Sequence, residues 1–213
     1  MTILWDWNGT LLDDAEPIAA LTDKVFRENG YRGTTLEEYR WLFRFPVHDY
    51  YRDMGVPEED FDRMAWIWTD ASVKALGVPG LRSDTLSVLR RFREAGFRQV
   101  IVSAAEQSQL ETQLGFHPEL APLLDEVNGL GDIYAVSKIQ LARDYLERTG
   151  TPASEAVFIG DTTHDAEVAK ALGLRCILCE GGHQSPEVMQ SAGFPVVESL
   201  SGAADLLLGS REA

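Results

Sequence analysis

Residues 3–12 read Ile-Leu-Trp-Asp-Trp-Asn-Gly-Thr-Leu-Leu, and this stretch decides the fold of the chain. A short apolar run leads directly into Asp6, and a glycine and a threonine then precede a second apolar pair. An aspartate that follows a buried strand and opens a turn is where α/β enzymes place a nucleophile or a metal ligand. The stretch therefore predicts that Asp6 stands at the functional edge of a parallel sheet.

Length, charge and hydropathy exclude several classes of protein. A chain of 213 residues can form one α/β domain with an insertion and can bury roughly 70% of its unfolded surface. No segment approaches the roughly 18 to 20 apolar residues of a membrane span, and no signal peptide precedes the first strand, so we expect a cytoplasmic protein without a membrane partner. The net charge of −15 disfavours nucleic acid, which needs clustered cations. A small anionic substrate remains compatible, because local cations and a metal dominate the field inside a cleft.

The chain has two cysteines, Cys176 and Cys179, in the spacing Cys-x-x-Cys. They lie in an apolar segment typical of a strand, and no second pair completes a zinc site. We interpret them as core thiols, with redox or metal chemistry as the alternative.

The remaining sequence predicts a core interrupted by a helical insertion. Residues 13–78 have helical periodicity, with breaks that favour four or five short helices, and Val78-Pro79-Gly80 marks a hinge. Helices and strands then alternate, which indicates βαβ units and a parallel sheet. We expect helices near 83–95, 106–114, 138–148 (capped by Ser137) and 164–172, strands near 99–103, 156–160 and 174–178, and a short segment near 123–128. The predicted fold class is α/β: a Rossmann-like parallel sheet with helices on both faces, formed by residues 1–12 and 79–213, plus an inserted all-α cap, residues 13–78.

Polar residues stand where several of these elements meet. Asp6, Ser103 and Asp161 end predicted strands, Lys138 opens a helix, and Asp165 follows Asp161 by four residues. Carboxyl ends of parallel strands share one edge, so these side chains can converge on one pocket. Taken singly, each has an ordinary interpretation as a loop start, a helix cap or a solvated surface charge.

In this order the residues resemble the four motifs of the haloacid dehalogenase (HAD) superfamily of phosphohydrolases. The first motif of that family usually reads Asp-x-Asp-Gly-Thr, and here it reads Asp6-Trp7-Asn8-Gly9-Thr10. The resemblance covers nearly the whole chain. The insertion is similar to the small helical cap of phosphoglycolate phosphatase-like and β-phosphoglucomutase-like members.

The resemblance implies a role for each motif. Asp6 would attack phosphorus and form an aspartyl phosphate. Asp6, the backbone carbonyl of Asn8 and Asp161 would hold Mg²⁺, with Asp165 in support. The phosphoryl group would be held by the residues Thr10, Ser103 and Ala104, and Lys138 would offset negative charge on the nucleophile and the phosphate, although Ile139 stands where the family often has proline. The substrate would be a small phosphorylated metabolite, and the protein a monomer or a homodimer.

Asn8 departs from the family pattern at the position of the general acid and base. An amide has no titratable proton near neutral pH, so it cannot transfer one, and a loss of about 10²- to 10⁴-fold is the scale expected for such a group. Three hypotheses follow: a slow phosphohydrolase selective for good leaving groups, a phospho-ligand-binding or regulatory protein, or an enzyme in which His164 or His48 supplies the base.

The cap sequence leaves the substrate open. Arg44 and His48 lie where related caps carry a specificity loop, so they are candidates to bind a second anionic group of the substrate, with surface cations as the alternative interpretation. Two other chemistries of the family fit less well. A phosphonatase would recruit a lysine of the cap, and residues 13–78 contain only Lys24 and Lys74. Haloacid dehalogenases lack the metal-binding fourth motif that Asp161 and Asp165 resemble.

Overall fold

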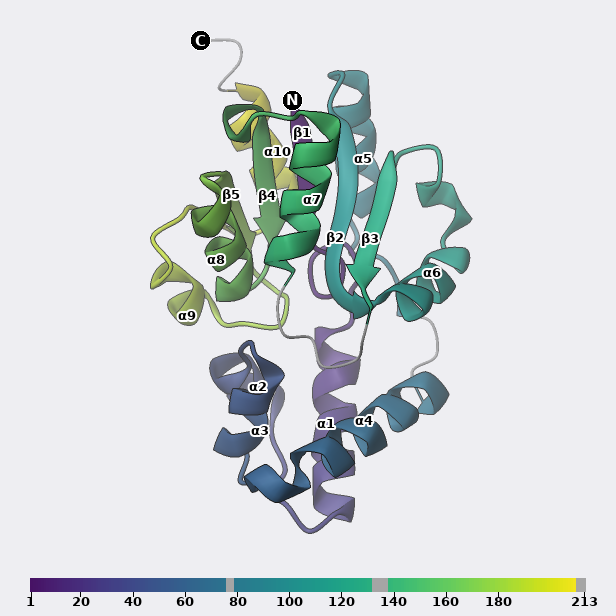
Figure 1. Ribbon diagram of the computed structural model, residues 1–213, viewed down its shortest axis with the longest axis vertical. Helices are drawn as coiled ribbons and strands as arrows, with labels where there is room; N and C mark the ends of the chain where they lie inside the picture. Colours follow the sequence, from purple (N-terminus) through teal and green to yellow (C-terminus); the bar gives the residue numbers. More distant parts are fainter. Residues whose placement is uncertain (76–78, 132–137, 210–213) are drawn as a thin grey trace.

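The computed structural model describes residues 1–75, 79–131 and 138–209. Its centre is a six-stranded parallel sheet in the order β3-β2-β1-β4-β5-β6 (Figure 1). The strands are β1 Thr2–Trp5, β2 Arg98–Glu106, β3 Glu126–Leu130, β4 Ala156–Gly160, β5 Arg175–Cys179 and β6 Val196–Val197. The predicted fold class, an α/β protein built on a parallel sheet, is confirmed.

Strand β1 lies in the middle of the sheet and sets the position of Asp6. Trp5, its last residue, pairs with Ile101 of β2 and Ile159 of β4. The backbone N–H of Asp6 then donates to the carbonyl of Ile159 at 2.9 Å. Because β1 and β4 end at nearly the same level, the residues just after them share one edge of the sheet, beside the longer strand β2.

Helices cover both faces of the sheet (Figure 1). Side chains of β1 alternate between two hydrophobic clusters, with Ile3 and Trp5 in one and Leu4 in the other. Burial on both faces is the usual environment of a parallel strand. The first cluster includes residues of α5 Thr85–Glu94, α6 Gln107–Gly115 and α10 Leu200–Gly209; the second includes residues of α7 Ile139–Thr149, α8 Thr163–Leu172 and α9 Pro186–Gln190.

The insertion forms a separate group of helices beyond the carboxyl edge of the sheet (Figure 1). It consists of α1 Ala15–Glu28, α2 Leu36–Leu42, α3 Val47–Asp53, a 3-10 turn Glu58–Asp60 and α4 Phe61–Ala75. These helices enclose a third cluster rich in aromatic rings, including Phe26, Tyr39 and Tyr50. The expected boundary between cap and core at residue 78 lies outside the described residues, and we retain the division into residues 13–78 and the flanking core as a proposal.

Several elements differ from the sequence expectation. Helices α1 and α4 have 14 and 15 residues and are not short. Strand β2 continues to Glu106, because its pairing with β3 shifts register between Val102 and Glu106 and then resumes. The sequence prediction did not include α9, β6 and α10. Ser137, the expected cap of α7, lies outside the described residues.

The two cysteines are buried free thiols. Cys176 belongs to one face of the sheet and Cys179 to the other, and burial raises the pKa of Cys179 to about 12. This arrangement favours the interpretation of core thiols. Within the described residues, no helix is both long and apolar enough to cross a lipid bilayer.

Candidate active site

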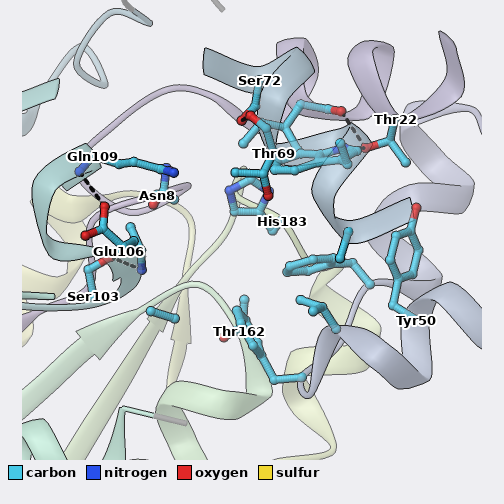
Figure 2. A pocket seen from close by; sticks show the side chains of 18 of the residues that line it. Asn8, Thr22, Tyr50, Thr69, Ser72, Ser103, Glu106, Gln109, Thr162 and His183 are labelled. Atoms are coloured by element: carbon cyan, nitrogen blue, oxygen red, sulfur yellow. Dashed lines mark hydrogen bonds between the residues drawn. The ribbon is translucent and has the colours of Figure 1, made fainter. Parts of the chain in front are cut away.

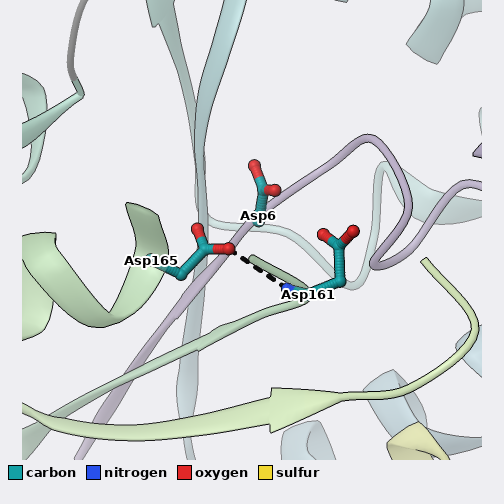
Figure 3. A group of neighbouring side chains, drawn as sticks. All are labelled: Asp6, Asp161 and Asp165. Carbon is teal, nitrogen blue, oxygen red and sulfur yellow. Dashed lines mark hydrogen bonds between the residues drawn. The ribbon is translucent and has the colours of Figure 1, made fainter. Parts of the chain in front are cut away.

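Three buried carboxylates meet at the carboxyl edge of the sheet: Asp6, Asp161 and Asp165 (Figure 3). Each offers an oxygen within 4.8 Å of an oxygen of the others. Asp6 follows β1 directly, and Asp161 follows β4. The central strands thus bring together acids that lie 155 residues apart in number, as the sequence predicts.

Asp165 is fixed by the first turn of α8. Its Oδ2 accepts hydrogen bonds from the backbone N–H groups of Asp161 and Thr162, at 3.1 and 2.9 Å, and from the Thr162 hydroxyl at 2.8 Å. This capping box satisfies donors at the helix start. The last residue of β4, Gly160, has no side chain, and a side chain at this position would collide with the Asp165 carboxylate.

Lys138 joins two of the three acids. Its buried Nζ lies 2.6 Å from Oδ1 of Asp6 and 2.6 Å from Oδ1 of Asp165. Burial alone would lower the pKa of Lys138, but Asp165 and Asp6 outweigh it and raise the pKa above its ordinary value. Burial raises the pKa of Asp6 to about 8, despite the attraction of Lys138 and with further repulsion from Asp165 and Asp161. Negative charge therefore remains in excess around Asp6.

Asp161 is held rigidly from both sides. Its Oδ1 accepts from the Thr10 hydroxyl at 2.7 Å, and its Oδ2 accepts from the backbone N–H of His183 at 2.6 Å. A side chain at Gly9 or Gly182 would collide with the same carboxylate, and Gly9 also has a φ of 72°, which favours glycine.

The donor set fits a hard divalent cation. Carboxylate and carbonyl oxygens are the ligands that Mg²⁺ prefers. Burial raises the pKa of Asp161 as well, against the opposing charge of His183. A bound cation would therefore relieve repulsion among buried acids that one lysine only partly offsets. Three hydrogen bonds to Oδ2 of Asp165 and the ion pair of its Oδ1 with Lys138 suit a supporting role for this residue.

Asn8 is held by a residue that sequence analysis missed. The Asn8 amide donates to Oδ2 of Asp14 at 2.6 Å, and the Gly9 N–H donates to Oδ1 at 2.7 Å. Asp14 also lies 3.2 Å from Nε2 of His183, whose Nδ1 is 2.9 Å from the Tyr39 hydroxyl. A continuous chain of polar contacts thus runs from the first motif into the cap.

His183 is the second missed residue. Burial lowers its pKa, but Asp14, followed by Asp161 and Asp6, raises the pKa to about 9, so the ring is charged at neutral pH. Its signal was present in the sequence, since Gly181-Gly182-His183 follows β5 as Asp161 follows β4. Because β5 ends at the same edge of the sheet, His183 could have been predicted as a candidate site residue.

A pocket of about 200 Å³ opens beside the acids, between the core and the inserted helices (Figure 2). Asp6, Asn8, Ser103, Ala104 and His183 line its core side. In Figure 2, Thr22, Thr69 and Ser72 of the inserted helices face Asn8, Ser103 and Glu106 of the core across His183. Ser103 accepts from the N–H of Ala105 at 3.0 Å through its Oγ.

Other predicted site residues lie away from this pocket. The Thr10 hydroxyl is directed to Asp161. Arg44 pairs with Asp53 at 2.5 Å, and His48 lies 2.6 Å from Glu58. None of the three is among the residues that line the pocket.

His164 also lies outside the pocket lining. Its Nε2 accepts from the backbone N–H of Lys138 at 3.4 Å, and its Nδ1 lies 3.1 Å from Glu167. Burial lowers the pKa of His164, with the nearby charge of Lys138 acting in the same direction. Both ring nitrogens thus have partners, and the histidine that reaches the pocket wall is His183.

Comparison with known proteins identifies the family. The family model of haloacid dehalogenase-like hydrolases matches residues 3–179, so the chain belongs to that family. Phosphoglycolate phosphatase of Pseudomonas savastanoi pv. phaseolicola is 26% identical over 204 residues, covering 85% of this chain and 70% of the relative. Phosphoglycolate phosphatase of Aliivibrio fischeri is also 26% identical, over 92% of this chain and 90% of the relative. The family and these relatives together support a phosphatase.

Solved structures share the fold. A predicted phosphatase from Clostridium acetobutylicum superposes with a TM-score of 0.81 at 22% identity, covering 98% of each chain. A haloacid dehalogenase-like family protein from Streptococcus pneumoniae gives a TM-score of 0.83 at 17% identity, covering 97% of each chain. At these identities the comparison extends to the architecture alone.

Proposed function

We propose that the protein is a Mg²⁺-dependent phosphohydrolase that acts on a small phosphorylated metabolite through an aspartyl phosphate on Asp6. The observation that carries the proposal is the position of Asp6: its carboxylate lies on the wall of the pocket and 2.6 Å from the buried Nζ of Lys138. A nucleophile next to a cavity and a fixed cation is the arrangement that phosphoryl transfer requires.

The residues around Asp6 divide the work of the first step. An oxygen of Asp6 attacks phosphorus, and the bond from phosphorus to the leaving oxygen breaks. Ser103 and Ala104 stand on the same wall, where a hydroxyl and a backbone amide can donate to phosphoryl oxygens. Lys138 keeps positive charge beside the nucleophile throughout, because both of its acidic partners are buried with it.

We assign the metal to the acidic cluster. Asp6, Asp161 and the backbone carbonyl of Asn8 would hold Mg²⁺, while Asp165 would support them through Lys138 and the α8 capping box. The ion would offset the charge that builds on the phosphoryl oxygens. Support for this assignment comes from the raised pKa values of Asp6 and Asp161, which reflect acids in need of a counter-charge.

Asn8 attenuates the reaction and makes it selective. Its amide cannot protonate a leaving oxygen, and it is already committed to Asp14. Positioning and charge stabilisation remain available, so esters and acyl phosphates with good leaving groups lose least. The same hydrogen bond supports the second hypothesis, a protein that binds a phosphorylated ligand without turnover, because an Asn8 amide held by Asp14 cannot transfer a proton.

One experiment separates the two functions. Phosphate release from acetyl phosphate and p-nitrophenyl phosphate is measured with and without Mg²⁺, for the native protein, Asp6→Asn and the control Asp13→Asn. Asp13 is exposed, so the control removes the same charge outside the site. A phosphatase loses its Mg²⁺-dependent release in Asp6→Asn and keeps it in Asp13→Asn. Ligand binding by the native protein without any release would instead establish the binding function.

A further inference from the structure

The part of the pocket that extends beyond the acids indicates which organic group is attached to the phosphate of the substrate. This inference rests on the proposed function. The cavity has a volume of about 200 Å³, somewhat larger than the roughly 150 Å³ that admits benzene. The phosphoryl-binding end occupies the side near Asp6 and Ser103. The remaining space therefore suits a group no larger than a single ring.

The walls around that space are apolar and aromatic. The insertion contributes apolar side chains from its helices and from the connection between α2 and α3: the rings of Phe43, Phe45 and Trp68 and the aliphatic side chains of Ile18 and Val47. Phe43 lies edge-on to Phe45, with ring centroids 5.4 Å apart. Such walls bind an apolar ring through burial and edge-to-face contact. Some hydroxyls on the wall are engaged within the protein: Thr22 accepts from the indole N–H of Trp68 at 3.0 Å and donates to the carbonyl of Ile18. The buried Tyr50 hydroxyl has no partner among the described residues, so it leaves one polar contact for a substituent on the ring.

The described part of the pocket lining also offers no free cation for a second anionic group. Among the described residues that line it, none is lysine or arginine. The charge of His183 is offset by Asp14. Glu106 adds a negative charge to the wall, and hydrogen bonds from Ser108 hold the pKa of Glu106 below its ordinary value. Arg44, the cap arginine nearest in sequence to Phe43, is paired with Asp53 outside the cavity.

We propose that the substrate is an aryl phosphate: a phosphate monoester whose other part is one neutral, mainly apolar ring. The cavity and its walls select the ring, and the charge distribution disfavours a carboxylate or a second phosphate on it. This class differs from phosphoglycolate, whose small organic part carries a carboxylate.

Asn8 favours the same class for an independent reason. When Asp6 forms its bond to phosphorus, the ester oxygen leaves with the bonding electron pair. A phenol has a pKa of about 10, against about 15.7 for water, so a phenolate departs without a proton from the enzyme and is protonated by solvent. Water then attacks the aspartyl phosphate, which yields inorganic phosphate and restores Asp6. An aryl ester thus needs less than an alkyl ester from the residue that Asn8 replaces.

The test compares substrates with and without a negative charge on the organic part. We measure kcat/KM for phenyl phosphate, 4-carboxyphenyl phosphate, phosphoglycolate and acetyl phosphate with the native protein. Phenyl phosphate is expected to exceed 4-carboxyphenyl phosphate and phosphoglycolate by about 10-fold or more, the scale of one unfavourable charge contact. A native preference for phosphoglycolate or for the carboxylated ring would overturn the proposal.

Variants of helix α4 test whether the pocket itself sets the preference. Thr69 lies on the wall, so Thr69→Lys places a cation there, while Thr69→Met has a similar length without charge. Val73→Lys adds the same charge on α4 at an exposed position outside the cavity. Thr69→Lys should shift the ratio of phenyl to 4-carboxyphenyl phosphate by about 10-fold toward the carboxylated substrate, and neither control should. An equal shift in Val73→Lys would contradict selection by the pocket.

Failure of the proposed function gives a different result. In that case no substrate, including acetyl phosphate, is turned over in a manner that depends on Asp6. Binding then decides the inference, measured by calorimetry with phenyl phosphate and phosphoglycolate on the Asp6→Asn variant with Mg²⁺. Tighter binding of phenyl phosphate supports the proposed ligand class even without turnover, and tighter binding of phosphoglycolate overturns it.

Discussion

The side-chain amide of Asn8 lies 2.6 Å from the buried carboxylate of Asp14, to which it donates a hydrogen bond. The departure in the first motif is therefore paired with a specific acid at the start of the insertion. An aspartate at position 8 would face a like charge at this distance, whereas the amide satisfies the acid. The site is adapted to asparagine, and a single substitution does not simply restore the usual family motif.

We predict that Asn8→Asp alone gains little activity and lowers stability. A carboxylate at the half-buried position 8 and the buried Asp14 cannot both ionise in contact without a cost. The hydrogen bond that Asp14 accepts from Asn8 would also be lost, and about 1 to 3 kcal/mol is the scale of leaving a buried group unsatisfied. Combining Asn8→Asp with Asp14→Asn exchanges the two partners and retains the hydrogen bond. The double variant should raise turnover of an alkyl phosphate by about 10²- to 10⁴-fold over the native protein.

The measurement is kcat/KM for an alkyl phosphate together with urea unfolding of the native protein, both single variants and the double variant. Asp14→Asn alone serves as the control for the lost charge next to His183. A gain in Asn8→Asp equal to that of the double variant would show that Asp14 does not oppose an acid at position 8.

The His183 and Asp14 pair predicts a pH-dependent stability. The folded pKa of His183, about 9, lies above its ordinary value of 6.5, so the contribution is complete below pH 6.5 and is lost as the pH rises through 9. Its upper bound is about 3 kcal/mol. In metal-free protein, the free energy of unfolding should fall less between pH 6 and 9.5 for His183→Gln than for the native protein. The control is His48→Gln, at a half-buried position of the insertion, and parallel curves for His183→Gln and native protein would refute the assignment.

Loss of Lys138 should be severe. Lys138→Met leaves Asp6 and Asp165 without the cation that each contacts at 2.6 Å. We expect a destabilisation of about 3 to 5 kcal/mol and a loss of phosphate release. Lys170→Met, at an exposed position of α8, is the matched control. Native stability and turnover in Lys138→Met would show that Lys138 is not needed to offset the charges of Asp6 and Asp165.

Binding of Mg²⁺ should release protons. Because the pKa of Asp6 is raised to about 8 in the metal-free protein, its carboxyl group is mostly protonated at pH 7, and a cation held by that oxygen displaces the proton. Calorimetric titrations in buffers of different ionisation enthalpy count the protons. The release should vanish in Asp6→Asn and persist in Asp13→Asn. Binding without proton release at pH 7 would indicate that the ion does not contact Asp6.

The sequence predicts the core of this fold because its signals are local. The strand before Asp6 and the strand before Asp161 are short apolar runs followed by an acid, and parallel pairing brings their ends together. Asp14 and His183 escaped prediction because their partners are distant: Asp14 reads as a helix-start acid, and only the folded chain places it 3.2 Å from His183. Arg44 forms an ion pair with Asp53 within the cap. The residue type of Arg44 and its position in the sequence do not indicate this pairing.

The most direct test of the central claim is chemical trapping of the phosphorylated residue. The protein is mixed with acetyl phosphate and Mg²⁺, quenched in acid, reduced with borohydride and digested, and the peptide that contains residue 6 is analysed by mass spectrometry. Borohydride converts an aspartyl phosphate to homoserine. We expect this conversion at Asp6, dependent on Mg²⁺ and unaffected by Asp13→Asn. Phosphate release that continues with Asp6 unmodified, or modification of another residue in its place, would contradict it.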